Sequence, residues 1–252
     1  MIGYVEHHIV DHCNLNCKGC SHFVPLAPKW EEDLETFTKD FTQLRDLTDG
    51  QIGTIRLMGG EPLLHPQLVS FVEITRELFP NSQIQVVTNG ILLKKRSEEL
   101  APVFNAKGII VCVSNYGLNL DLNEITKDFK YKVVHWKNQL YHIGLKREPV
   151  KNPQGANFNF ECCDIHRGRW YYFQNGNIYH CCIGANIHHL NATGENFPEP
   201  SGISIYDHTL QEVEDYLSKP NELCKYCDTL YRSKTYNNFD ISKKEKSEWI
   251  CQ

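Results

Sequence analysis

Three cysteines near the start of the chain have a spacing that suits metal chemistry. Cys13, Cys17 and Cys20 form a C-x3-C-x2-C motif. Three thiolates from one short loop can bind three irons of a cubane iron–sulfur cluster and leave the fourth iron open to another ligand. A zinc loop is the alternative, and His12 or His22, which flank the motif, could then supply a fourth ligand. The spacing predicts a metal-binding loop, with a cluster favoured and zinc still open.

A second group of cysteines lies in the second half of the chain. Four of them could bind one further metal site: Cys163, Cys181, Cys224 and Cys227. The C-x2-C pair at 224 and 227 is a common metal-binding knuckle, for which a structural zinc is the alternative to an iron–sulfur cluster. Cys162 and Cys182 each adjoin one of the four, so the residues alone leave open which member of each doublet is the ligand.

Length, charge and cysteine usage limit the class of protein. The 252 residues include 11 cysteines, carry a formal net charge of −5 and contain no apolar run long enough for a membrane span. The start lacks a basic segment followed by an apolar one, so we expect a cytoplasmic chain without a secretory signal. In that reducing compartment, closely spaced cysteines are more often metal ligands than disulfides. The negative charge predicts no nucleic-acid partner, and the missing span predicts no membrane.

Short apolar runs alternate with amphipathic segments through the first half of the chain. Strands are predicted at 4–10, 54–58, 84–87, 108–113 and 131–136, and helices near 34–47, 66–78, 94–105 and 121–129. This alternation predicts an α/β fold, a partial (β/α)6 parallel barrel over residues 1–148. Loops at the carboxyl ends of parallel strands carry the sites of such folds, and the cysteine loop follows the first strand.

The second half of the chain has a different character. The alternation stops near Lys146, and the stretch from there to Asn159 is predicted to be a linker because it contains prolines, a glycine and polar residues. Residues 149–252 are predicted to form a small cysteine-rich α+β domain. Its clearest element is a β-hairpin between Trp170 and Cys181, with Asn175-Gly176 at the turn.

The cysteine loop after a first strand, together with Gly59-Gly60-Glu61-Pro62 after the second, resembles the radical S-adenosylmethionine (SAM) superfamily. The resemblance implies that the open iron binds the amino and carboxylate groups of SAM. The reduced cluster then cleaves SAM to methionine and a 5′-deoxyadenosyl radical, which abstracts a hydrogen from the substrate. It also implies a one-electron donor such as flavodoxin or ferredoxin.

The resemblance assigns the residues after later strands as well. Gly59, Gly60, Glu61 and Pro62 would hold the methionine part of SAM, since a backbone without Cβ atoms can approach it and Glu61 or nearby carbonyls can accept from its ammonium. Four strand-end residues would touch SAM or substrate: Thr88, Asn89, Ser114 and Asn115. One residue departs from the family pattern, because Gly19 stands where an aromatic residue commonly packs near the adenine.

The aromatic hairpin that ends in a cysteine resembles the auxiliary-cluster domains, called twitch or SPASM, that follow radical SAM barrels. That resemblance, and the cysteine spacing of a twitch dehydrogenase acting on an aminocyclitol, assign an auxiliary [4Fe–4S] cluster to Cys163, Cys181, Cys224 and Cys227. Cys162 and Cys182 are the alternative ligands. Adjacent cysteines rarely both bind one cubane, which favours the one-cluster twitch form over the two-cluster form.

Three residues are candidates for a direct part in catalysis. Cys182, like Cys162 or Cys251, could give a hydrogen atom to a substrate radical, which would make the reaction an epimerisation, although small buried thiols are the plain alternative. Lys146 and Arg147 could bind an anionic substrate group or assist deprotonation of a hydroxyl, and a salt bridge in the linker is the alternative.

The sequence therefore predicts a radical SAM oxidoreductase acting on a small polar substrate: a sugar, a cyclitol or a nucleotide-linked sugar. Dehydrogenation and epimerisation both stay open. Two alternatives belong to other classes of function, a radical SAM maturase that modifies a peptide or protein and a non-catalytic zinc-binding interaction module.

Overall fold

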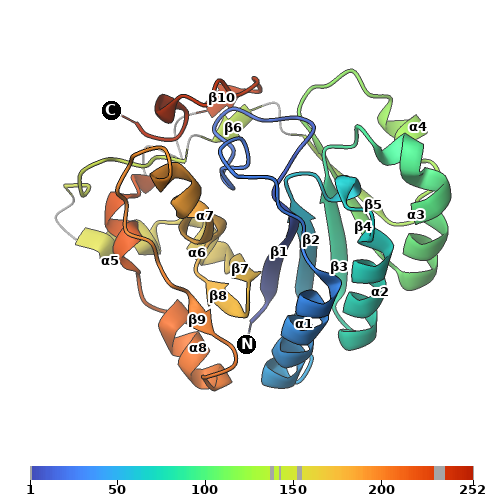
Figure 1. Cartoon of the computed structure of the whole chain (residues 1–252), viewed down its shortest axis with the longest axis horizontal. Helices are drawn as coiled ribbons and strands as arrows, with labels where there is room; N and C mark the ends of the chain where they lie inside the picture. Colours follow the sequence, from blue (N-terminus) through green and yellow to red (C-terminus); the bar gives the residue numbers. More distant parts are fainter. Residues whose placement is uncertain (1, 137–138, 142, 152–154, 230–235, 252) are drawn as a thin grey trace. The chain divides into compact units, whose positions relative to one another are not determined.

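The computed structural model describes residues 2–136, 139–141, 143–151, 155–229 and 236–251 (Figure 1). Contacts between residues divide the chain into two compact units. The first unit comprises residues 1–15 and 29–138, and the second comprises residues 16–28 and 139–252. The cysteine loop therefore begins in the first unit and ends in the second. The sequence-based division at residue 148 stays a prediction about the domains.

The first unit is an α/β structure built on a parallel sheet. Its elements are β1 (Tyr4–Val10), α1 (Leu34–Thr48), β2 (Thr54–Gly59), the 3₁₀ turn η1 (Pro62–Leu64), α2 (Leu68–Leu78), β3 (Gln83–Thr88), α3 (Leu93–Lys107), β4 (Ile110–Asn115), α4 (Leu122–Thr126) and β5 (Lys132–Trp136). The strands pair in the order β5-β4-β3-β2-β1, all parallel. The predicted α/β class is confirmed. Five parallel strands are described in this unit, at the five places where the sequence predicted strands, and a sixth strand of the predicted (β/α)6 barrel is not among them.

Apolar residues at helical spacing explain how the first unit closes over its sheet. Asp33 caps α1 by accepting a hydrogen bond from the Thr36 amide at 2.8 Å. Phe37 and Phe41, one turn apart on this helix, are fully buried and stack with ring centroids 3.9 Å apart. Phe37 also meets Phe71 of α2 edge to face, at 4.7 Å. The helical face that the sequence pattern predicted is therefore the face that packs the core.

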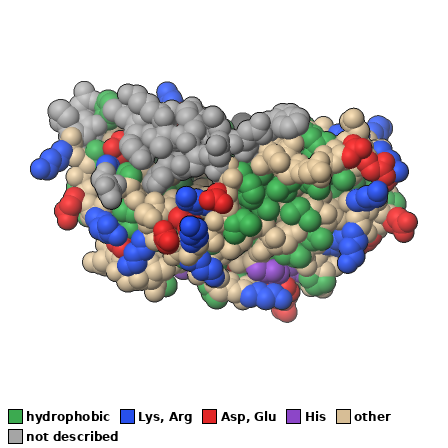
Figure 2. All heavy atoms as spheres, turned by 90° about the horizontal axis from the view of Figure 1, so that it is seen from above, with side chains coloured by type: hydrophobic (Ala, Val, Ile, Leu, Met, Phe, Trp, Pro, Cys, Tyr) green, Lys and Arg blue, Asp and Glu red, His purple; other side chains and the backbone are tan. Residues whose placement is uncertain are grey.

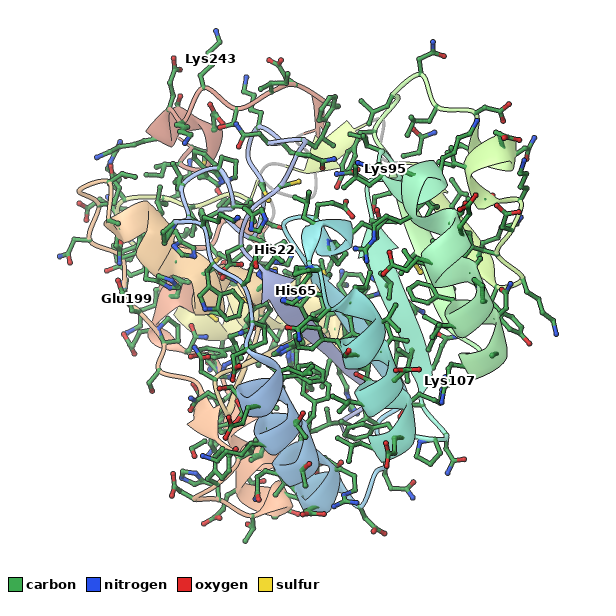
Figure 3. The ribbon with its side chains drawn as sticks, turned by 45° about the vertical axis from the view of Figure 1, so that its right-hand side comes forward. His22, His65, Lys95, Lys107, Glu199 and Lys243 are labelled. Atoms are coloured by element: carbon green, nitrogen blue, oxygen red, sulfur yellow. The ribbon has the colours of Figure 1, made fainter. Side chains whose placement is uncertain are left out.

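Crossover helices bring the strand-end loops to one edge of the sheet. Figure 3 shows Lys95 and Lys107 at opposite ends of α3, which connects two neighbouring strands. A helix that leads from the end of one parallel strand to the start of the next must run back along the sheet. The loops that follow β1, β2, β3 and β4 consequently meet at the carboxyl edge, where the predicted site residues lie.

The second unit mixes short helices with antiparallel strands. Its elements are β6 (Gln139–Tyr141), α5 (Gly155–Glu161), α6 (Asp164–Gly168), β7 (Tyr171–Gln174), β8 (Asn177–Tyr179), α7 (Cys182–Asn191), β9 (Ile203–Ser204), α8 (Leu210–Leu217), the 3₁₀ turns η2 (Glu222–Tyr226) and η3 (Lys246–Glu248), and β10 (Tyr236–Asn238). The pairs β7–β8, β8–β9 and β6–β10 are antiparallel. Asn175 and Gly176 both have positive φ, 50° and 67°, so the predicted hairpin is confirmed with a type I′ turn.

Two helices in this unit differ from the sequence-based expectations. The predicted linker from Lys146 to Asn159 is wrong in its last part, because α5 begins at Gly155. The helix α7 was not predicted at all. Ile183, Ile187 and Leu190 are its buried apolar face at helical spacing, and the Cys181 sulfur caps its start by accepting from the Gly184 amide.

Two properties of the structure concern the membrane and the nucleic acid, the partners that the sequence predicted to be absent. Among the described residues, no helix has both the length and the apolar character needed to cross a bilayer. On the face shown in Figure 2, cationic and anionic side chains are interspersed, and neither sign forms a continuous field. The prediction that nucleic acid is not a partner is not tested by this distribution and stays a prediction.

Candidate functional site

The loop after β1 carries the first predicted ligand, Cys13, and touches the turn after β3. The Cys13 sulfur accepts from the Leu15 amide at 3.4 Å. The side-chain amide of Asn89 donates to Asn14 Oδ1 at 2.7 Å and lies 3.8 Å from the Cys13 sulfur. None of the 11 cysteines, all of them in described residues, forms a disulfide, and Cys13, like the other two cysteines of its motif, is half-buried. Two residues predicted from separate motifs thus lie side by side in the first unit.

The glycine pair after β2 is required by the backbone of the first unit itself. A Cβ at Gly59 would lie 2.1 Å from the Val10 carbonyl oxygen, and a Cβ at Gly60 would lie 2.1 Å from that of His12. The Gly60 amide donates to Val10 O at 2.9 Å and the Glu61 amide to His12 O at 3.0 Å. The missing Cβ atoms therefore let the chain after β2 run against the chain after β1. Contact of these glycines with SAM stays a prediction.

Glu61 is a fully buried carboxylate that joins two strand-end loops. Its Oε1 accepts from the Thr88 hydroxyl at 2.7 Å and the Leu63 amide at 3.0 Å, and its Oε2 accepts from the Asn89 amide at 2.8 Å. Burial raises the pKa of this carboxyl to about 7, although these hydrogen bonds oppose the shift. The structure thus shows Glu61 as a positioning residue for the turn after β3, and its contact with the SAM ammonium stays a prediction.

The raised pKa of Glu61 predicts a stability that falls as pH rises. A carboxyl with a folded-state pKa of about 7 and an ordinary value of 4.5 keeps its proton better in the folded chain. As the pH rises from 4.5 to about 7, ionisation of this carboxyl lowers the free energy of unfolding by about 3 kcal/mol in total. The full loss is reached only above the folded-state pKa. We expect Glu61→Gln to remove this part of the pH dependence. Urea unfolding from about pH 4 to about pH 8 measures it. Glu35→Gln, at an exposed carboxyl of α1, is the control; parallel pH profiles for wild type and Glu61→Gln would contradict the prediction.

The remaining strand-end candidates are Pro62, Ser114 and Asn115, which lie in or beside the turns after β2 and β4. Pro62 begins the buried turn η1, directly after Glu61. Ser114 and Asn115 end β4 and are buried. The Asn115 side chain accepts from the Gly117 amide at 2.9 Å, which closes its own turn. Roles for Pro62, Ser114 and Asn115 toward SAM or substrate stay predictions.

The four cysteines predicted to bind a second metal all lie in the second unit. Cys163 and Cys181 directly precede α6 and α7, while Cys224 and Cys227 lie on η2 and at its end. Burial, together with the charges of the nearby Cys181 and Cys163, raises the pKa of Cys224 to about 12. Repulsion between thiolates falls off with distance, so Cys163 and Cys181 lie within electrostatic range of Cys224, although no three of the four sulfurs, all of them in described residues, lie within 4.8 Å of one another. Bound metal would offset the repulsion, which makes the donor set suitable for a metal site.

The polar residues around the Cys224 sulfur, Asn221 and His180, were not among the site residues predicted from the sequence. Asn221 caps η2, and its Oδ1 accepts from the Cys224 amide at 3.3 Å and lies 3.5 Å from the Cys224 sulfur. Its side-chain nitrogen lies 3.4 Å from Nδ1 of the buried His180, whose Nε2 lies 3.1 Å from the Tyr216 carbonyl oxygen. An asparagine three residues before a cysteine has the spacing of a helix cap, and that signal could have identified Asn221.

The contacts described for the three candidate catalytic residues, Cys182, Arg147 and Lys146, are ones that stabilise the fold. Cys182 is the first residue of α7 and belongs to the hydrophobic core of the second unit. Arg147 forms a two-pronged ion pair with Glu195 at 3.0 and 3.1 Å, which is the salt bridge weighed as the alternative. The Lys146 amide donates to Tyr226 O at 2.9 Å. The Cys182 sulfur lies within 4.8 Å of a ring nitrogen of His22, which flanks the cysteine loop. The catalytic roles of all three residues stay predictions.

A parallel α/β unit with a thiol-bearing loop at the carboxyl edge of its sheet defines an α/β protein with a candidate metal centre. A family model described as the Radical SAM superfamily matches residues 8–135, which is half of the chain. The chain belongs to the radical SAM superfamily. Membership implies a [4Fe–4S] cluster and SAM as cofactors, and the three half-buried thiols of the cysteine loop are donors that suit such a cluster.

Two curated relatives match part of the chain. GTP 3′,8-cyclase of Sulfurimonas denitrificans is 27% identical over 156 residues, which cover 60% of this chain and 48% of that protein. GTP 3′,8-cyclase of Nautilia profundicola is 27% identical over 145 residues, covering 58% and 45%. The chain thus spans about half the length of the curated relatives it matches. A solved structure of BtrN in an open conformation superposes with a TM-score of 0.50 at 17% identity, covering 90% of this chain and 92% of that one, and indicates the fold alone.

Proposed function

We propose that this protein is a radical SAM oxidoreductase acting on a small polar substrate, a sugar, cyclitol or nucleotide-linked sugar. In this proposal, residues 1–148 are the catalytic barrel and residues 149–252 a twitch-like domain with an auxiliary [4Fe–4S] cluster. The placing of all four cysteines in the second unit, with Cys163 and Cys181 within electrostatic range of Cys224, is the observation that supports it. A second redox centre could accept the electron of a substrate radical, which makes the reaction a net dehydrogenation. A cytoplasmic flavodoxin or ferredoxin would supply the initiating electron.

The chain's own residues have defined tasks in this proposal. When bound, the first cluster and SAM supply the 5′-deoxyadenosyl radical that abstracts hydrogen from the substrate. Cys13, Cys17 and Cys20 hold that cluster as thiolates. Glu61 holds the turn at Thr88 and Asn89 against the cysteine loop through its buried hydrogen bonds. At this edge of the sheet the Gly60 and Glu61 amides donate to the carbonyl oxygens of Val10 and His12, and the Asn89 side chain donates to the loop that carries Cys13.

A redox-neutral rearrangement of a nucleotide is the second candidate function. The curated relatives carry the name GTP 3′,8-cyclase, and their similarity covers 60% and 58% of this chain. In such a reaction the product keeps the mass of the substrate. In a dehydrogenation the product is lighter by two hydrogens, so product mass separates the two candidates.

Anaerobic turnover tests the proposed function. The reconstituted chain is incubated with SAM and dithionite, in ordinary and in deuterated buffer, with panels of sugars, cyclitols, nucleotide-linked sugars, nucleoside triphosphates and precursor peptides. The 5′-deoxyadenosine and the products are then analysed by mass spectrometry. A lighter product with stoichiometric 5′-deoxyadenosine supports dehydrogenation. Solvent deuterium in a product of unchanged connectivity indicates epimerisation through a thiol. An isomeric product from a nucleoside triphosphate supports the second candidate, and turnover of a precursor peptide alone would contradict both.

The auxiliary cluster has its own test in metal content. We expect about eight irons per chain in the wild type and about four in Cys224→Ala, because removal of one ligand opens a site of four thiolates. The paired variants Cys162→Ala and Cys163→Ala are the internal control, and only the second is expected to lose iron. If Cys162→Ala loses iron and Cys163→Ala keeps it, the ligand is Cys162 and not Cys163. One zinc per chain that depends on Cys224 would contradict an auxiliary cluster.

A further inference from the structure

The last described residues, 239–251, lie against the second half of the cysteine loop, within the second unit. We refer to these residues as the C-terminal strap. The Lys18 amide donates to Asp240 O at 2.9 Å, and the Ser242 amide donates to Asn16 O at 2.9 Å. These two bonds enclose an antiparallel bridge between Cys17 and Ile241. The backbone on both sides of a predicted iron ligand is therefore paired with the strap.

Trp249 attaches the strap to the backbone of Cys20, the third cysteine of the loop. Its indole Nε1 donates to the Cys20 carbonyl oxygen at 2.9 Å, and its side chain is fully buried. Phe23 packs beside it, with ring centroids 6.1 Å apart. A buried indole usually needs a hydrogen-bond acceptor, and here the acceptor is the backbone of a predicted ligand. Trp249 therefore fixes the position of Cys20 by both packing and hydrogen bonding.

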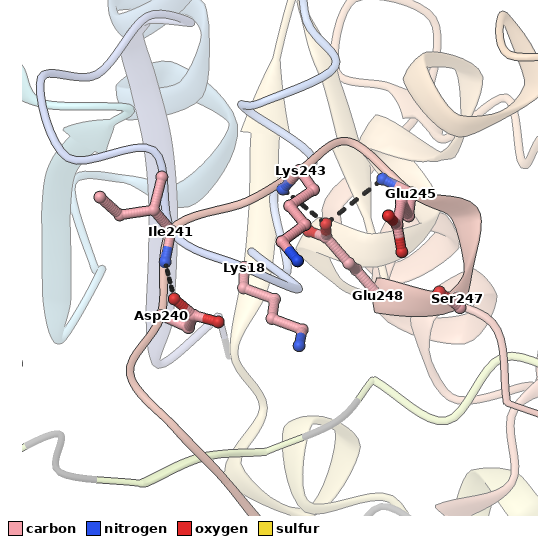
Figure 4. A pocket seen from close by; sticks show the side chains of 7 residues that line it. All are labelled: Lys18, Asp240, Ile241, Lys243, Glu245, Ser247 and Glu248. Atoms are coloured by element: carbon pink, nitrogen blue, oxygen red, sulfur yellow. Dashed lines mark hydrogen bonds between the residues drawn. The ribbon is translucent and has the colours of Figure 1, made fainter.

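Glu248 folds the strap into the shape that fits the loop. Its carboxylate accepts from the Ser242 hydroxyl at 2.6 Å and from the amides of Lys243 at 2.7 Å and Glu245 at 3.3 Å. Figure 4 shows the two amide bonds and the pocket of about 190 Å³ between this turn and Lys18 of the loop. Three bonds to one buried carboxylate hold the strap as a compact turn rather than a loose tail.

Gly19 is adapted to the strap. Its φ is +64°, and a Cβ there would lie 2.8 Å from the Glu248 carbonyl oxygen. Both the backbone conformation and the approach of the strap exclude a side chain at this position. The departure from the family pattern thus has a structural cause, because the strap lies where the side chain of residue 19 would begin.

The strap also reaches the second group of cysteines. The Cys251 amide donates to Leu145 O at 2.8 Å, and Leu145 forms bridges with both Ile250 and Cys227. One stretch of backbone therefore connects the surroundings of Cys17 and Cys20 with those of Cys227.

We propose that the C-terminal strap positions Cys17 and Cys20 and thereby tunes the first metal site, with Trp249 and Gly19 as its positioning residues. The proposal relies on the proposed function only for the identity of the metal. The contact between strap and loop belongs to the chain itself. Displacing the strap should loosen the backbone of the loop and change the environment of the bound metal.

Three single variants separate the strap contact from general damage. Trp249→Phe removes the indole donor and keeps an aromatic ring, and it leaves the loop sequence unchanged. Gly19→Ala forces a Cβ against Glu248 O. Gly108→Ala is the matched control, because Gly108 has nearly the same φ, +65°, but nothing lies within 4 Å of its added Cβ. Both glycine variants carry the energetic cost of placing alanine at a positive φ. Only Gly19→Ala adds a clash with the strap, so the difference between the two variants measures the strap contact.

Two measurements on the full chain test the proposal. We expect hydrogen exchange at the Lys18 and Ser242 amides to quicken about tenfold or more in Trp249→Phe and Gly19→Ala, but not in Gly108→Ala. In the iron-loaded chain, the same two variants should alter the SAM-dependent electron paramagnetic resonance signal and the midpoint potential. Exchange at wild-type rates would overturn the strap contact, and faster exchange with unchanged signal and potential would overturn the positioning role. A chain that binds zinc and no iron contradicts the proposed function instead, and zinc retention by the variants then decides the role of the strap.

Discussion

Cys17→Ala is expected to abolish formation of 5′-deoxyadenosine from SAM and to lower the iron content by about four per chain. The reason is that a site-differentiated cubane needs three protein thiolates, and the cysteine loop has no other cysteine between Cys13 and Cys20. The rate should fall to the level of the reaction without protein. The measurement is anaerobic incubation with SAM and dithionite, with 5′-deoxyadenosine quantified alongside iron and sulfide.

Cys112→Ala is the control for this experiment. Cys112 is a buried thiol on β4, outside both groups of predicted ligands, and its sulfur lies 3.4 Å from Gln85 Oε1. We expect this variant to keep its iron and its SAM cleavage. A Cys17→Ala chain that still made 5′-deoxyadenosine at the wild-type rate would refute the assignment of the loop.

Gly60→Ala should produce the largest loss of stability among single methyl additions proposed here. The new Cβ would lie 2.1 Å from the His12 carbonyl oxygen, which is backbone and cannot rotate away. The chain after β2 and the chain after β1 would have to separate, which would break the hydrogen bond from the Glu61 amide to His12 O. We expect a cost of about 3 kcal/mol or more, with most of the protein insoluble or unfolded if the fold is only marginally stable.

Denaturant unfolding of the metal-free chain measures this loss. Gly3→Ala is the matched control, because Gly3 has an ordinary φ like Gly60 and no atom within 4 Å of an added Cβ. The control should stay within about 0.5 kcal/mol of the wild type. Equal midpoints for the two alanine variants would show that the loops after β1 and β2 do not approach each other as described.

Local sequence patterns carried much of the prediction of the fold. The alternation of strands and helices, the aromatic stripe at Phe37 and Phe41, and the Asn175-Gly176 turn each depend on neighbours within a few residues. Such signals are set by backbone geometry, so they are present in the sequence itself. The same holds for the C-x3-C-x2-C loop, whose ligands are close in the chain.

The same kind of reasoning failed where long-range contacts decide the outcome. The helix α5 lies within a stretch whose glycine and prolines predicted a linker. Sequence reasoning also gave no sign that the Glu61 carboxylate accepts hydrogen bonds from Thr88 and Asn89, 27 and 28 positions further along the chain; its contact with SAM stays a prediction. Whether a carboxylate points to a ligand or into the protein depends on which loops pack around it, and spacing carries no information on that.

Sequence spacing was enough to identify the candidate metal-binding loop, because three thiols at short spacing must be neighbours in any fold. How that loop is held depends on contacts that form only when distant parts of the chain pack together. The bond from Trp249 to Cys20 joins residues 229 positions apart, and the clash that excludes a side chain at Gly19 comes from Glu248. A glycine in the sequence says that a side chain is absent, and the packed structure says which backbone lies where that side chain would be.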